Sequence, residues 1–366
     1  MKKIHIFGLQ SLRASFQIGP YHFDRVSDYD EQVKRLPQSE TLRTNWNSET
    51  GEKIDTRIPG RRGDHACTYI ATVDGEEPGS NLFEKDTPQL IDIVFLMRLL
   101  SGQGVYLEHE LETFPARFKG ELLIHDPFFI DEIGCILSSV DWLRAKNAGL
   151  GPSLYYYFRS CTSDMINFSG ADIAIAWNML ASAYAAAYPP DGKEKFLEEK
   201  SKACEKLKPV LAEIGKENKG LAARISGALG SVSFDHLGDQ VSHLTSSVGL
   251  LGGLDHDRVM GRLRTCVSHI RARLVHSGIF PDPKTGWTHR AQRYAVPSMR
   301  ILFVLTCARL LGVKEAFYPF EEQLKTIASF FGDENPDFRG EHPFSEENSR
   351  FEERLRAASI ESSPSV

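Results

Sequence analysis

The segment from His256 to Phe280 carries an apolar stripe that constrains the fold more than any other stretch. Five apolar residues recur along it at steps of four, four, three and four: Val259, Leu263, Val267, Ile270 and Leu274. This is the spacing of one face of an α-helix, and Gly278 provides a stop signal just after His276. Arginine and histidine occupy the other faces. We therefore expect a helix that buries one face in a core and presents a basic surface on the rest.

Basic residues are concentrated on and after this helix, although the whole chain has a net charge of -6. From Arg258 to Arg300, nine Lys and Arg stand against one acid, Asp282, so the local charge is +8 over 43 residues. Eight of the nine are arginine. A local basic surface on an acidic chain is typical of a phosphate-binding face. The alternative is that these arginines pair with acids elsewhere in the fold.

Composition places the chain among ordinary globular proteins, with 366 residues, 41% hydrophobic and 25% charged. The longest predominantly apolar runs, 91–97 and 301–307, are far shorter than the about 20 residues that span a bilayer. The N-terminus lacks the apolar core of a signal peptide. The six cysteines lie at least 26 residues apart, which argues against a zinc site or a disulfide framework. We expect a cytoplasmic protein with reduced cysteines, no metal, no cofactor and no membrane contact.

The residue pattern divides the chain into three segments. Residues 1–125 predict a small α+β domain, with strands at 3–9, 69–73 and 105–111, a polar stretch at 39–64 and an amphipathic helix at 89–100. Residues 126–332 predict an α-helical domain. Residues 333–366 are polar and end in serines, which predicts a partly disordered tail. The expected fold class is therefore mainly α, a helical bundle preceded by a small α+β domain.

Helical patterns follow one another through the second segment, at 130–147, 154–166, 172–188, 193–219, 221–229, 236–248 and 290–311. The alanine-rich pattern at 172–188 has apolar residues on more than one side, which predicts burial. The pattern at 193–219 pairs Lys with Glu four residues apart, which predicts a solvated face rather than a binding site. Pro297 predicts a kink in the last of these helices.

The end of the basic helix carries the strongest motif. An arginine followed five residues later by histidine is weak evidence alone, but His276 stands at the helix end, beside Gly278 and a Pro-rich loop. The string at positions 271–278, R-A-R-L-V-H-S-G, resembles the R-N-x-x-V-H-x-G signature of HEPN domains, especially the Apea-like group. The resemblance extends more loosely to the helical layout of residues 126–330, including the Ala/Trp-rich stretch at 174–180.

The resemblance implies an HEPN-like helical bundle that pairs as a homodimer and places two R-x4-H segments across one cleft. Many such domains are metal-independent endoribonucleases. The residue chemistry agrees, because histidine titrates near neutrality and suits removal of the 2′-hydroxyl proton. Arginine offers a permanent charge for the phosphate in the transition state. We expect Arg271 and His276 to be catalytic, and a further set to contact RNA: Arg264, Arg273, His269 and Arg262.

Two functional hypotheses follow from this resemblance. The first is a homodimeric HEPN ribonuclease that acts as a toxin or phage-defence effector, with the N-terminal domain sensing a trigger or a partner protein. The second is a non-catalytic HEPN-like scaffold that binds RNA, a nucleotide or a partner protein. Ala272 and Asn178 motivate the second hypothesis, because the family usually has a polar residue at the first position and often an acid at the second.

Overall fold

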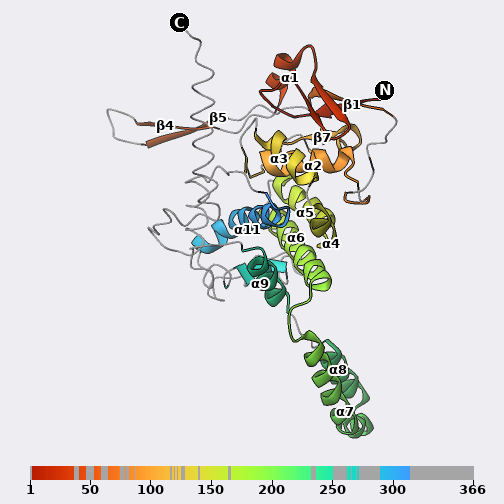
Figure 1. Ribbon diagram of the computed structural model, residues 1–366. Coiled ribbons are helices and arrows are strands. Elements are labelled where there is room, and N and C mark those ends of the chain that lie inside the picture. The colour runs from red at the N-terminus through yellow and green to blue at the C-terminus, as the bar shows by residue number, and fades with distance from the viewer. Residues whose placement is uncertain are drawn as a thin grey trace.

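The computed structural model gives a mainly helical protein with a small antiparallel sheet (Figure 1). The residues that it describes are 2–36, 41–46, 53–58, 65–74, 79, 82–85, 87–115, 118, 120–121, 123–124, 128–138, 141–163, 166–231, 236–249, 261, 263–264, 266–268, 270–271 and 289–313. The mainly α fold class predicted from the sequence is confirmed. Within these ranges, no helix combines the length and the apolar character needed to cross a membrane.

A five-stranded antiparallel sheet forms the N-terminal end of the molecule. Its spatial order is β2 (Ser15–Ile18), β3 (Tyr21–Arg25), β6 (Cys67–Val73), β1 (Lys2–Phe7) and β7 (Tyr106–Leu107). Side chains alternate across it, so Tyr21 and Phe23 are buried while His22 and Asp24 are exposed. A short helix, α1 (Tyr29–Arg35), follows β3. The strands expected near 3–9 and 69–73 are confirmed as β1 and β6.

Two features of this half differ from the sequence-based expectation. The strand expected over 105–111 ends at Leu107 and continues as a 3-10 turn, η1 (Glu108–Glu110). The turn forms because the Glu110 carboxylate folds back and accepts a hydrogen bond from the Leu107 N–H at 2.9 Å. In addition, a two-stranded hairpin of β4 (Thr41–Trp46) and β5 (Lys53–Ile58) lies in the polar stretch 39–64, where no strand is expected.

Helix α2 (Leu90–Ser101) lies at the centre of the protein, and all of its residues are buried. The predicted helix is therefore correct in position but wrong in being amphipathic. Its two charged residues serve the fold. Asp92 caps the helix, accepting hydrogen bonds from the N–H groups of Phe83 at 2.7 Å and Gln89 at 2.8 Å. Arg98 is fully buried near the other end, where Gly102 adopts a positive φ of 66° and terminates the helix.

The remaining helices of the body are α3 (Phe128–Leu137), α4 (Asp141–Asn147), α5 (Leu150–Thr162), α6 (Ile166–Ala187), α9 (Leu237–Ser247) and α11 (His289–Leu310). The single helix expected at 130–147 is thus two helices. Helices α5 and α6 approach closely at Gly149, where an added Cβ would lie 2.5 Å from the Cβ of Ala183. Glycine is required there, also because its φ is +72°.

One apolar core runs from the inner face of the sheet through α2 into α5, α6 and α11. Aromatic contacts mark its course: Phe95 of α2 meets Phe158 of α5 at a centroid distance of 5.0 Å. Trp177 of α6 meets Phe303 of α11 at 5.4 Å and donates a hydrogen bond to the Met299 carbonyl at 3.0 Å. The burial predicted for α6 is confirmed, because Trp177 is fully buried.

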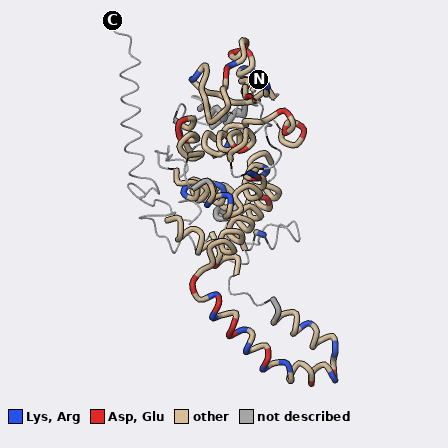
Figure 2. The backbone as a smooth tube through the Cα atoms, turned by 45° about the vertical axis from the view of Figure 1, so that its right-hand side comes forward, with Lys and Arg blue, Asp and Glu red and all other residues tan. Residues whose placement is uncertain are grey.

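Helices α7 (Lys193–Glu217) and α8 (Lys219–Ser231) form a hairpin that projects away from the body (Figure 1). No residue of α7 is buried. Lysine and glutamate alternate along it (Figure 2), and exposed pairs such as Lys202 with Glu198, at 2.6 Å, follow the helical spacing. The solvated face predicted for this segment is confirmed.

Candidate functional site

The helix with the predicted Arg-His pair buries the face that the sequence indicates. Leu263, Val267 and Ile270 are fully buried, which confirms three positions of the stripe, and Cys266 joins them. Arg271 comes directly after Ile270 and is exposed. It forms no hydrogen bond or ion pair with the part of the chain that the structure describes.

Of the other residues predicted to act with Arg271, only Arg264 belongs to the described residues. His276, Arg273, His269 and Arg262 lie outside the described residues, as do Val259 and Leu274 of the stripe. The pairing of Arg271 with His276 remains a prediction from the motif.

Two arginines of the basic segment have partners within the fold. The Arg264 guanidinium lies 2.5 Å from the Asp239 carboxylate at the start of α9. Arg300 of α11 donates a hydrogen bond to the Ser160 hydroxyl at 3.2 Å and another to the Ser169 hydroxyl, which ties α11 to α5 and α6. The alternative of pairing with an acid within the fold is therefore observed for Arg264, whereas Arg300 bonds to hydroxyl groups. The positive charge of the segment is therefore only partly free to bind phosphate.

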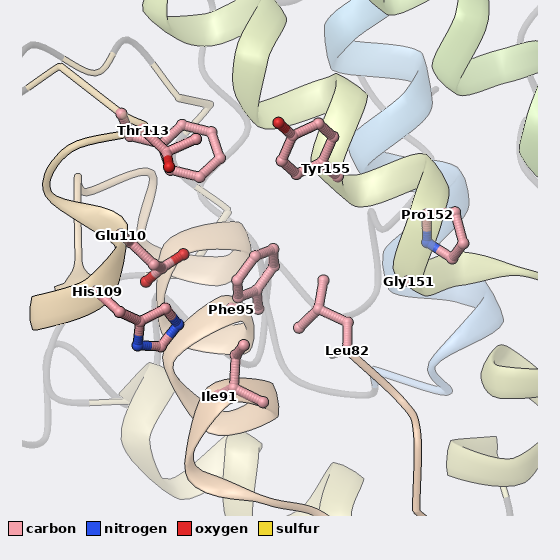
Figure 3. A pocket seen from close by; sticks show the side chains of 10 residues that line it. Leu82, Ile91, Phe95, His109, Glu110, Thr113, Gly151, Pro152 and Tyr155 are labelled. Atoms are coloured by element: carbon pink, nitrogen blue, oxygen red, sulfur yellow. The ribbon is translucent and has the colours of Figure 1, made fainter. Parts of the chain in front are cut away.

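A groove lies between the turn that follows η1 and helix α5. Its first part is a cavity of about 360 Å³ with an apolar floor from Ile91 and Phe95 of α2. Figure 3 shows His109 and Thr113 on one side of this cavity and Tyr155 of α5 on the other. The cavity is open to solvent and lies where the N-terminal half of the chain meets the helical half.

The second part of the groove is a cavity of about 460 Å³ that shares Thr113, Phe114 and Tyr155 with the first. The two cavities are therefore adjacent, and we call them together the α5 groove. The second part extends over α5 and α6, where the wall includes Arg159 and Asp172. Both parts fall within the range of about 300–1,000 Å³ that is typical of small-molecule sites.

Asp172 and Arg159 are the charged residues that line the second part of the α5 groove. The Arg159 guanidinium lies 5.5 Å from the centre of the Tyr156 ring and 3.4 Å from the Asp172 carboxylate. The Asp172 side chain is only 10% exposed, whereas the Arg159 side chain is 46% exposed. Burial raises the pKa of Asp172, and the charge of Arg159 offsets part of this rise. The Asp172 carboxylate is thus poorly solvated, and the cation beside it is the partly exposed Arg159 guanidinium at 3.4 Å.

A buried ion pair holds the turn that forms one wall of the groove. Arg98 donates hydrogen bonds to both oxygens of the Glu110 carboxylate at 3.0 Å and to the Val105 carbonyl at 2.8 Å. The rings of four aromatic residues surround its guanidinium at 4.5–5.3 Å: Phe95, Tyr106, Phe114 and Phe158. Removing either partner would leave an uncompensated buried charge. Phe114 and Thr113 are therefore held in fixed positions along the groove.

The sequence predicts none of this groove. Arg159 and Asp172 lie 13 positions apart on different helices, and only the packing of α5 on α6 brings them together. One signal was present: Asp172 is the only Asp, Glu, Lys or Arg in the 22 residues of α6. An isolated acid in an apolar helix is rarely buried unless it has a structural partner or a functional role.

Thiol and metal chemistry receive no support among the described residues. No cluster of three His, Cys, Asp or Glu side chains there has the arrangement of a metal site. All six cysteines are described, none of them forms a disulfide, and Cys161, Cys266 and Cys307 are buried. Burial raises the pKa of Cys161 to about 11, so this thiol is protonated at neutral pH and unreactive.

The sequence matches no protein-family model, and neither curated proteins nor solved structures give a significant match.

Proposed function

We propose that the protein is an HEPN-type endoribonuclease that needs no metal ion, with Arg271 and His276 as its catalytic residues. The observation that supports the proposal best is the state of Arg271. This arginine follows a buried helical stripe, yet its own side chain is exposed and has no partner among the described residues. An arginine used for stability would be expected to have a partner, as Arg264 and Arg300 do.

The proposed chemistry is an intramolecular transesterification. His276 takes the proton of the ribose 2′-hydroxyl, and the resulting O2′ attacks the adjacent phosphorus while the P–O5′ bond breaks. The O5′ leaving group takes up a proton from water, giving a 2′,3′-cyclic phosphate and a 5′-hydroxyl end, and His276 returns its proton to the solvent. Arg271 stabilises the charge on the phosphate oxygens. In the proposed homodimer, the second copy supplies the same pair to the same cleft.

Variants of the two proposed catalytic residues test this function. With labelled RNA in EDTA, we expect the native chain to cleave, and Arg271→Ala or His276→Ala to lower the rate by about 10²–10⁴-fold. Arg35→Ala is the matched control, because Arg35 is exposed on α1. It should cleave like the native chain.

Two results would reject cleavage by this pair. The first is full activity in Arg271→Ala. The second is tight RNA binding by the native chain with no cleavage, which would favour the non-catalytic scaffold.

A further inference from the structure

Asp172 is an unusual carboxylate. It is 7% exposed, and its nearest cation, a guanidinium nitrogen of Arg159, lies 3.4 Å away. Within the described ranges it accepts no hydrogen bond, whereas Asp92, which is fully buried, accepts two. Buried carboxylates are normally satisfied by several donors. The oxygens of Asp172 therefore have unused acceptor capacity, and they line the α5 groove.

Aromatic rings flank this carboxylate. Tyr155 is 36% exposed and Phe168 is 62% exposed, and both line the same part of the groove. Phe114 lies behind Tyr155 with a centroid distance of 5.7 Å, which supports the tyrosine ring from below the surface. Exposed aromatic rings of this kind provide surfaces on which a planar ligand can stack.

The charges of the groove limit what the ligand can be. A second cation beside Asp172 would lie close to Arg159, and an anion on Arg159 would lie close to Asp172. Both arrangements are repulsive. A neutral planar group avoids this if it presents donors to Asp172 and an acceptor to Arg159 side by side. Among nucleobases, guanine has this pattern, since O6, N1–H and the N2 amino group are adjacent on one edge.

We propose that the α5 groove binds a guanine base, with N1–H and N2–H donating to Asp172, O6 accepting from Arg159, and the ring stacking on Tyr155. Adenine and cytosine offer the carboxylate a single amino group on the equivalent edge, so they bind more weakly. The site does not use Arg271 or His276, so it stands apart from the proposed cleavage. A guanine can come from a free nucleotide or from single-stranded RNA.

Calorimetric titration of the full chain with nucleoside monophosphates tests the site. We expect GMP to bind, and AMP, CMP and UMP to bind at least about 10-fold more weakly, because each loses a hydrogen bond to a charged group. IMP lacks only the N2 amino group and should lose roughly 10- to 150-fold. Equal binding of all five nucleotides, or no binding of GMP, would overturn the proposal.

Variants then locate the binding. Asp172→Asn should weaken GMP by at least about 10-fold, while Asp131→Asn, an exposed carboxylate on α3, should leave it unchanged. Thermal unfolding of each variant confirms that it is folded. GMP binding unaffected by Asp172→Asn would contradict the assignment.

Two further experiments are needed. The first distinguishes RNA from the free nucleotide as the source of guanine, and the second distinguishes guanine binding from the proposed cleavage. Tighter binding of a single-stranded RNA pentamer with one guanine than of GMP identifies RNA as the source, and the reverse order identifies the free nucleotide. His276→Ala must still bind GMP if the sites are separate. Loss of GMP binding in that variant would contradict a site confined to the α5 groove.

Discussion

At the scale of single residues, two of the buried acids, Glu110 and Asp172, have opposite surroundings. Glu110 is held by the two hydrogen bonds from Arg98 and by the Leu107 N–H, so its charge is compensated. Asp172 has only the Arg159 guanidinium at 3.4 Å. Glu110 therefore stabilises the fold, whereas the carboxylate oxygens of Asp172 can accept further hydrogen bonds from a ligand.

The pH dependence of stability follows from the raised pKa of Asp172. The ordinary pKa of an aspartate side chain is 3.8. As pH rises above this value, the Asp172 carboxyl ionises in the unfolded chain before it ionises in the folded chain. The free energy of unfolding therefore falls as pH rises from 3.8 to the raised pKa of Asp172. Asp172→Asn cannot ionise. We expect it to be more stable than the native chain by about 1 kcal/mol at neutral pH, with the difference closing toward pH 3.

Urea unfolding at several pH values measures this difference. Asp131→Asn provides the exposed comparison, because the Asp131 side chain is 53% exposed, and it should change little at any pH. An Asp172→Asn variant that is clearly less stable at neutral pH would show that the carboxylate is satisfied within the fold.

At the scale of elements, helical periodicity predicts most of the helices correctly. The stripe at Leu263, Val267 and Ile270 is buried, and α7 is solvated, because both patterns are set by local spacing. Periodicity fails where tertiary packing decides. Helix α2 is buried on every side because the sheet and the helical half enclose it, and the strand expected at 105–111 is cut short by the Glu110 side chain.

The contrast between the body and the projecting hairpin gives a prediction for two leucines. Leu154 of α5 is fully buried, and Leu154→Ala should cost about 2–5 kcal/mol of unfolding free energy. Leu207 of α7 is 37% exposed, and Leu207→Ala should change stability by no more than about 0.5 kcal/mol. Chemical denaturation measures both. A comparable loss in Leu207→Ala would show that α7 is buried against another chain in solution.

At the scale of the whole molecule, the two proposed sites use different residues. The cleavage site is centred on Arg271, and its motif is visible in the sequence because its two residues are five positions apart. The α5 groove is assembled from α2, α5, α6 and the turn after η1, so sequence spacing carries no sign of it. Helical packing alone creates that site, and one apolar core joins the elements that form it.

We propose that this chain cleaves RNA through the 2′-hydroxyl. The most direct measurement compares an RNA oligonucleotide with its fully 2′-O-methylated counterpart, both incubated with the native chain in EDTA. Methylation removes the nucleophile and leaves the phosphates in place. We predict 2′,3′-cyclic phosphate ends from the RNA and no cleavage of the methylated strand. Cleavage of both strands, or of neither, would contradict the account.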